Sequence, residues 1–261
     1  MNVVIPGVDG DLTGVLLEPE GTEHDGAPTR GSADAPARLP AVVVLPEIDG
    51  LCEGTVAAAR RLAAAGYVAL ALDLFAPYGS TPRLRTMEDT HAWLSRLNDR
   101  RQLSDLAMAF SWLEALPEVD PDRLGAVGFS VGGRYSMMMT TEPHGLRAVV
   151  TMYTRVWPGA AVGPRALAPG EHVASFAAPV CAVFGADDEM IPSEQVDELS
   201  RLFRVHAAVG HEVHVVPGRH FFANESRPRR YLPESAEKAW TIALGFLAAN
   251  MAPRGGSHLP S

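Results

Sequence analysis

Short runs of β-branched and other apolar residues alternate with stretches of helical composition along most of the chain. Runs such as Ala41-Val42-Val43-Val44-Leu45 are typical of strands buried on both faces. The alternation predicts one α/β fold: a mostly parallel central sheet with helices on both faces. The expected strands are 41–45, 67–74, 123–129, 148–153, 180–184 and 212–216, and the expected helices are 55–65, 103–113, 132–140, 196–203 and 235–251.

The 261 residues fit a single domain that spans 1–261. A Gly/Ala/Pro/Ser-rich stretch at 20–38 has no hydrophobic period, and we predict a mobile surface loop there. Only about 19 residues precede it, too few for a separate core. Residues 252–261 are expected to form a flexible tail.

Composition excludes several classes of protein. Hydrophobic residues make up 47% of the chain, which is enough for a packed core and excludes a disordered protein. The net charge of −9 disfavours nucleic acid or an anionic membrane surface as a partner. Two cysteines, Cys52 and Cys181, cannot form a disulfide scaffold or a four-thiolate zinc site. Because neither a signal peptide nor a long apolar run is visible, we expect a cytoplasmic protein, of undetermined oligomeric state.

The most informative motif is Gly128-Phe129-Ser130-Val131-Gly132-Gly133, between an expected strand and an expected helix. It matches the nucleophile elbow G-x-S-x-G, a tight turn whose glycines allow close backbone approach. Such a turn lifts the Ser130 hydroxyl above the sheet. It also places the Val131 amide at a helix N-terminus, where it can stabilise an oxyanion.

A serine nucleophile needs a base that is oriented by an acid, in the chain order Ser, Asp or Glu, His. Two adjacent acids, Asp187 and Asp188, follow the strand at 180–184, and His220 follows the strand at 212–216. The sequence therefore predicts a catalytic triad at neighbouring strand ends, with the choice between the two acids left open by spacing alone.

A metal pair at His211 and His214 is disfavoured, because residues three apart in a strand point to opposite faces. No metal and no organic cofactor is expected.

The chain resembles the dienelactone hydrolase family of the α/β-hydrolases. The resemblance runs from about residue 12 to 248, outside the 20–38 loop, and rests on the segments 45–50, 72–76, 128–133 and 220–224. Residues 185–192 match the family pattern G-x-x-D-x-x-[VI]-P, which aligns Asp188 with the acid.

The resemblance implies further roles. Glu47 would contact the nucleophile, and Ile48 would supply the second oxyanion-hole amide. Because Glu47 would then lie beneath the pocket, we also expect it to be at least partly buried with a raised pKa. Phe129, Tyr153 and Phe221 are expected pocket walls, and residues 157–170 an expected partial lid.

Two departures from the family pattern stand out. The lactone-cleaving members have Cys at the nucleophile position, where this chain has Ser130. They also place an Arg a few residues after the His, where this chain has Asn224, with Arg227, Arg229 and Arg230 further on.

The expected function is a serine hydrolase that cleaves a small-molecule ester or lactone through an acyl-enzyme. Two alternatives remain open at this stage. One is a thioesterase or acyltransferase of a biosynthetic pathway, and the other is a non-hydrolytic ligand-binding member of the fold.

Overall fold

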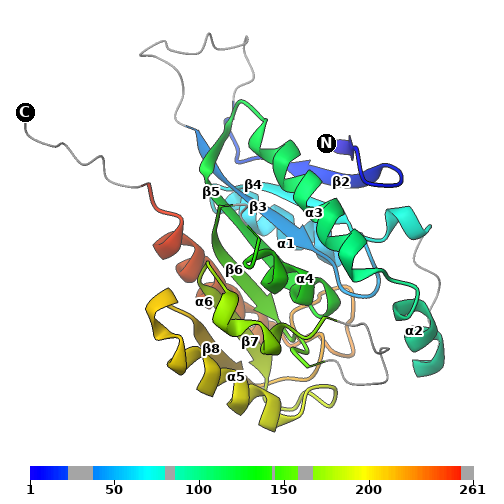
Figure 1. The fold of residues 1–261 in the computed structure, drawn as a ribbon, viewed down its shortest axis with the longest axis vertical. Coiled ribbons are helices and arrows are strands. Elements are labelled where there is room, and N and C mark those ends of the chain that lie inside the picture. The colour runs from blue at the N-terminus through cyan, green and yellow to red at the C-terminus, as the bar shows by residue number, and fades with distance from the viewer. Residues whose placement is uncertain (23–37, 80–85, 143–144, 158–166, 254–261) are drawn as a thin grey trace, which may run out of the picture.

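The computed structural model describes residues 1–22, 38–79, 86–142, 145–157 and 167–253. Its eight-stranded sheet has the order β1-β2-β4-β3-β5-β6-β7-β8 (Figure 1). The strands are β1 Asn2–Ile5, β2 Leu12–Leu17, β3 Leu39–Leu45, β4 Val68–Asp73, β5 Val119–Phe129, β6 Leu146–Met152, β7 Val180–Gly185 and β8 Glu212–Val216. The longer helices are α1 Glu53–Ala64, α2 Met87–Leu94, α3 Asp99–Glu114, α4 Val131–Met139, α5 Ser193–Val205 and α6 Pro233–Asn250.

From β4 to β8 every pair of neighbouring strands is parallel, and only β1 and β2 are added antiparallel at one edge. The central strands are buried on both faces, as their continuous apolar runs require: residues 41–45 of β3 and 180–185 of β7 are all buried. The predicted α/β-hydrolase fold with a mostly parallel sheet is confirmed.

Helices cover both faces of the sheet, with α3, α4 and α5 on one side and α1 and α6 on the other (Figure 1). Two glycines of β5 show how closely the helices pack against the sheet. A Cβ at Gly125 would lie 2.8 Å from Met251 Sδ, at the end of α6, and a Cβ at Gly128 would lie 2.6 Å from Gly133 Cα of α4. The two positions are three apart in a strand, so they face opposite layers.

The predicted elements are present. α3 and α5 are five residues longer than their sequence signals, β8 and α4 have the expected length, β4 is two residues shorter, and the others are one to four residues longer. The sequence patterns predict no bounds for β1, β2 or α2. The pattern of β2 alternates buried and exposed positions over only six residues, and α2 is a short helix. A capping box at Thr86 and Asp89 starts α2, and its hydrophobic stripe is too short to predict the helix.

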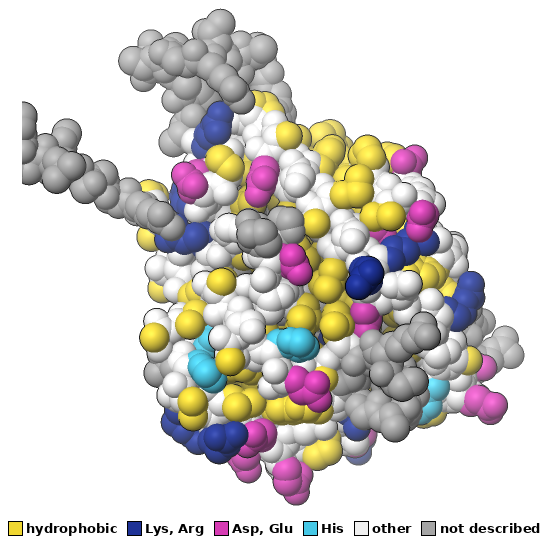
Figure 2. Space-filling model, viewed as in Figure 1, with side chains coloured by type: hydrophobic (Ala, Val, Ile, Leu, Met, Phe, Trp, Pro, Cys, Tyr) yellow, Lys and Arg dark blue, Asp and Glu magenta, His cyan; other side chains and the backbone are white. Residues whose placement is uncertain are grey.

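Most of the predicted mobile loop at 20–38, the predicted lid at 157–170 and the predicted tail at 252–261 lie outside the described residues. In the described part of the chain, no helix has the length and apolar character that a membrane span requires. On the face shown in Figure 2, acidic and basic side chains are interspersed and no patch of one sign dominates.

Candidate active site

Ser130 lies in the turn between β5 and α4, at φ 48° and ψ −113°, a backbone conformation that L-residues rarely adopt. Its own N–H donates to Met152 O (3.0 Å), and the N–H of Gly132 donates to Pro46 O (3.1 Å). A Cβ at Gly132 would collide with the Pro46 carbonyl, and one at Gly133 with the Thr154 hydroxyl. The two glycines are therefore required by close contacts with the Pro46 backbone and with the Thr154 side chain.

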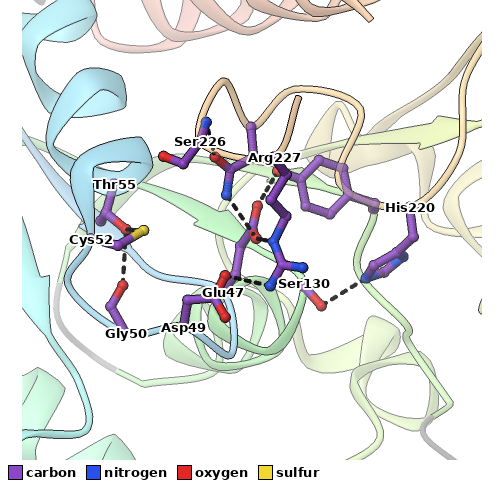
Figure 3. A network of polar contacts seen from close by, with 11 residues as sticks. Glu47, Asp49, Gly50, Cys52, Thr55, Ser130, His220, Ser226 and Arg227 are labelled. Carbon is purple, nitrogen blue, oxygen red and sulfur yellow. Dashed lines mark hydrogen bonds and ion pairs between the residues drawn. The ribbon is translucent and has the colours of Figure 1, made fainter. Parts of the chain in front are cut away.

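His220 and Asp188 lie in the loops that follow the last two strands of the sheet, β8 and β7, and come together with Ser130 at the carboxyl edge. Ser130 Oγ lies 3.0 Å from His220 Nε2, and His220 Nδ1 lies 2.7 Å from Asp188 Oδ2 (Figure 3 shows the first contact). The side chains of His220 and Asp188 are buried. The other oxygen of Asp188 accepts the N–H of Met190 (2.9 Å), which fixes the carboxylate in its loop.

Two buried residues, Val131 and Ile48, flank the turn. Val131 is the first residue of α4, so its amide has no acceptor within the helix. Ile48 follows Pro46 by two residues, and the hydrogen bond from Gly132 to Pro46 ties that loop to the start of α4. Among the described residues neither amide donates to a backbone carbonyl, so both can donate to an oxyanion.

Glu47 is 4% exposed and lies at the centre of a polar network beside Ser130 and His220 (Figure 3). Its Oε1 accepts from the Tyr153 hydroxyl (2.6 Å) and its Oε2 from Asn224 Nδ2 (3.0 Å). Arg227 Nε lies 3.5 Å from Oε2, and another nitrogen of Arg227 pairs with Asp49. In the described part of the chain, no hydrogen bond joins Glu47 to Ser130. The hydrogen bonds of the Glu47 carboxylate are those from Tyr153 and Asn224.

Burial raises the pKa of Glu47 above its ordinary value, and the hydrogen bonds from Tyr153 and Asn224 and the charge of Arg227 only partly oppose this. Burial and the neighbouring Glu47 charge also raise the pKa of the Tyr153 hydroxyl well above 10.0. The hydroxyl therefore stays protonated and serves Glu47 as a donor. The predicted burial and raised pKa of Glu47 are confirmed.

The three aromatic residues predicted as pocket walls occupy different places. Phe221 packs edge-on against His220, with ring centroids 4.3 Å apart, and the Arg227 guanidinium lies over the Phe221 ring, 4.0 Å from its centroid. Tyr153 is fully buried at φ 42°, and its ring also meets His220 edge-on at 5.2 Å. Phe129 and Tyr153 line a small pocket with Glu47, Arg61 and Trp240, whose lining does not include Ser130.

Sequence reasoning missed the network around Glu47. Asn224 and Arg227 were noted only as departures at an expected Arg position, and the hydroxyl of Tyr153 had no expected partner. These residues are up to 180 positions apart along the chain (Glu47 to Arg227). The sequence gives only a weak local signal for them. Glu47 and Tyr153 come just after the ends of β3 and β6, and Asn224 and Arg227 lie in the loop after His220, all at the edge where strand ends of a parallel sheet converge.

A parallel sheet that carries a Ser at the turn after a central strand, with an Asp and a His after the two strands at one edge, is the architecture of the α/β-hydrolases. Within that class the chain belongs to the dienelactone hydrolase family, because the model of that family matches residues 29–251. It is therefore a hydrolase that acts on ester bonds, as the sequence predicts.

Individual relatives agree with this assignment. A Bradyrhizobium protein named a 2-oxo-3-(5-oxofuran-2-ylidene)propanoate lactonase is 32% identical, over 80% of this chain and 84% of its own length. A Yersinia pestis protein named for carboxymethylenebutenolidase activity is 30% identical, over 93% of this chain and 85% of its own. A dienelactone hydrolase homologue of known structure from Klebsiella pneumoniae superposes with a TM-score of 0.79 at 27% identity, over 95% and 98% of the two chains.

Proposed function

We propose that the chain is a serine hydrolase that opens an ester or lactone through an acyl-enzyme, with Ser130 as nucleophile, His220 as base and Asp188 as the orienting acid. The observation that carries the proposal is the chain of two contacts, 3.0 Å from Ser130 Oγ to His220 Nε2 and 2.7 Å from His220 Nδ1 to Asp188 Oδ2. This is the order of hydrogen bonds that general-base activation of a serine requires.

In the first half-reaction Ser130 Oγ bonds to the substrate carbonyl carbon while its proton passes to His220 Nε2. The amides of Val131 and Ile48 stabilise the resulting oxyanion. Collapse breaks the bond to the alcohol oxygen, which takes the proton from His220. Water then attacks the acyl-Ser130 ester while His220 takes its proton; the acyl–Oγ bond breaks, His220 returns the proton to Ser130 Oγ, and the acid is released. With a lactone, the freed alcohol remains part of the acyl group throughout, so the second step releases a single hydroxy acid.

The choice of Ser over Cys changes what the site must supply. A cysteine thiol has a reference pKa near 8.5, so its surroundings can hold it as a thiolate. A serine hydroxyl stays neutral and loses its proton only during attack, so the base must be in contact with it beforehand. The contact between Ser130 and His220 supplies that condition.

Lactones are the first substrates to test, because the Bradyrhizobium relative is named for a lactone that carries a carboxylate. Two cations described in the structure lie beside the candidate site, and both are already paired: Arg227 with Glu47 and Asp49, and Arg61 with Glu237. We therefore propose neutral or weakly anionic esters and lactones as the substrate class. A panel of matched esters, lactones and thioesters, with and without a carboxylate, ranks these classes by kcat/KM.

The nucleophile is tested by labelling with a fluorophosphonate, followed by peptide mass spectrometry. We expect one adduct, on Ser130, and loss of both label and turnover in Ser130→Ala. Ser104→Ala is the matched control, because its hydroxyl only caps the Arg100 carbonyl on the exposed face of α3. An adduct on another residue, with Ser130 unmodified, contradicts the proposal.

A further inference from the structure

The motif His211-Glu212-Val213-His214 takes on a different meaning in the folded chain. His211 is engaged elsewhere: its Nδ1 accepts the Val180 N–H (3.1 Å), and its ring stacks on Phe203 with centroids 4.4 Å apart. Glu212 and His214 are two residues apart on β8, so both point to the same face of the sheet. His214 Nε2 lies 2.7 Å from Glu212 Oε2.

The neighbouring strand adds a third side chain of a kind that binds metals. Cys181 on β7 is the register partner of Glu212, so its thiol lies on the same sheet face as the side chains of Glu212 and His214. Cys181 forms no disulfide and is buried. Its Sγ, a carboxylate oxygen of Glu212 and a ring nitrogen of His214 all lie within 4.8 Å of one another.

This spacing suits a single cation. A zinc ion bound at about 2.0–2.3 Å to sulfur, nitrogen and oxygen brings these donor atoms to about 3.5 Å from one another. The three donors therefore need only small rotations to share one ion. A thiolate, an imidazole and a carboxylate together favour a borderline-soft cation over Mg²⁺ or Ca²⁺, which prefer oxygen ligands.

We propose that Cys181, Glu212 and His214 form a binding site for one zinc-class divalent cation, which joins the edge strand β8 to β7. Solvent or an added ligand completes the tetrahedron, as three protein ligands leave one position open.

Access and proton balance are consistent with such a site. The side chains of His214 and Glu212 are 34% and 48% exposed, so a cation can enter between them and reach the buried sulfur. Burial, and to a smaller degree the charge of Glu212, raises the pKa of Cys181 to about 12. The thiol is therefore protonated before binding, and its proton leaves to solvent as the metal–sulfur bond forms.

The position of the site indicates a stabilising role. Cys181 is the second residue of β7, whereas Asp188 follows the other end of that strand. The four steps from Cys181 to Gly185 extend the chain by about 13 Å, at about 3.3 Å each. The cation would thus bind at the amino ends of β7 and β8, away from Ser130, and hold together two strands whose loops carry Asp188 and His220.

Cobalt(II) is the direct probe, because a cobalt–thiolate bond gives an intense near-ultraviolet charge-transfer band. The full-length protein, reduced and kept under anaerobic conditions, is titrated with Co²⁺ and then with Zn²⁺. We expect a thiolate band that saturates at one Co²⁺ per chain and disappears as Zn²⁺ displaces it. We also expect Zn²⁺ to raise Tm, because it binds the folded state.

Variants locate the ligands. Cys181→Ala should abolish the band, while Cys52→Ser, which removes the other cysteine, should retain it. His214→Ala and Glu212→Gln change partly exposed side chains that the fold does not need, and each should weaken Zn²⁺ binding by at least about tenfold. Absence of the band in the wild type, its persistence in Cys181→Ala, or unchanged Zn²⁺ affinity in both β8 variants overturns the proposal.

Discussion

His220 Nδ1 lies 2.7 Å from Asp188 Oδ2, while the side chain of the preceding residue, Asp187, is exposed to solvent. The two acids are adjacent in sequence and chemically identical, so they differ only in where their carboxylates point. The Asp187 N–H donates to Gly218 O (2.9 Å), which holds the loop against the segment that leads to His220. The backbone of Asp187 thus helps to place the loop that leads to His220, and the carboxylate of Asp188 contacts the His220 ring.

This difference gives a paired prediction. Asp188→Asn should lower kcat by about 10⁴-fold, because an amide at this position favours the wrong tautomer of His220. Asp187→Asn keeps the backbone hydrogen bond and should change kcat by less than about threefold, as is usual for an exposed side chain. Steady-state kinetics on one ester compare the two. A larger loss at Asp187 would contradict the assigned acid.

The close contacts of the turn at Ser130 predict that a side chain at position 132 would not fit. Gly132→Ala would place a methyl group against the carbonyls of Leu45 and Pro46, which are backbone atoms and cannot move aside freely. We expect a loss of about 1–3 kcal/mol in the free energy of unfolding, as for an overpacked site, together with a loss of activity. Urea denaturation measures the first quantity.

Gly245 in α6 is the matched control, because a Cβ there meets no atom within 4 Å. Gly245→Ala should be neutral or should stabilise the protein by about 0.5–1 kcal/mol, through its higher helix propensity. If Gly132→Ala is as stable as Gly245→Ala, the turn has room for a side chain and the prediction is wrong.

The order of strands and helices and the positions of Ser130, Asp188 and His220 could be predicted because each depends on a local pattern. Buried parallel strands are continuous apolar runs, and strand ends converge at one edge. The environment of Glu47 could not be predicted in this way. Its carboxylate meets Tyr153, Asn224 and Arg227 only after β3, β6 and the loop beyond β8 are brought together, and no spacing in the sequence encodes those contacts.

Glu47→Gln is expected to change kcat/KM by about tenfold or less, equivalent to about 1.4 kcal/mol. The Glu47 carboxylate accepts hydrogen bonds from Tyr153 and Asn224, and the amide of the Gln variant has nearly the same shape and can occupy the same place. Removing a negative charge should also shift preference toward substrates with an anionic acyl group. Kinetics on neutral and carboxylate-bearing esters test this. A loss as large as that of Ser130→Ala on both series would place Glu47 in the proton-transfer machinery.

The raised pKa of Glu47 has a consequence for stability. Above the ordinary value of 4.5 the unfolded chain releases this proton more readily than the folded protein does. The contribution of Glu47 to wild-type stability therefore falls as pH rises from 4.5 toward the raised folded pKa. Glu47→Gln has no such carboxyl group, so the difference in Tm, variant minus wild type, should grow with pH across that window. A difference independent of pH would contradict the raised pKa.

The contribution of His211 to stability should depend on pH in the opposite sense. Burial lowers its pKa from 6.5 to about 4, so the folded protein keeps it neutral where the unfolded chain is protonated. Its contribution to stability is complete above pH 6.5 and is lost as pH falls toward 4. In His211→Asn, whose amide oxygen can still accept from Val180, the fall in Tm over this range should be smaller. An identical acid profile in both proteins would contradict this.

The sheet order leaves β8 hydrogen-bonded to β7 on one side only, and His220 is carried by the loop that follows β8. Ser130, by contrast, follows β5, which has neighbours on both sides. A strand with a single neighbour can separate from the sheet in a local opening that costs less free energy than global unfolding. His220 can therefore separate from Ser130 while the rest of the sheet is intact. Inactivation on heating should accordingly precede the loss of secondary structure, so that the catalytic lifetime of the enzyme is governed by the fraying of its last strand.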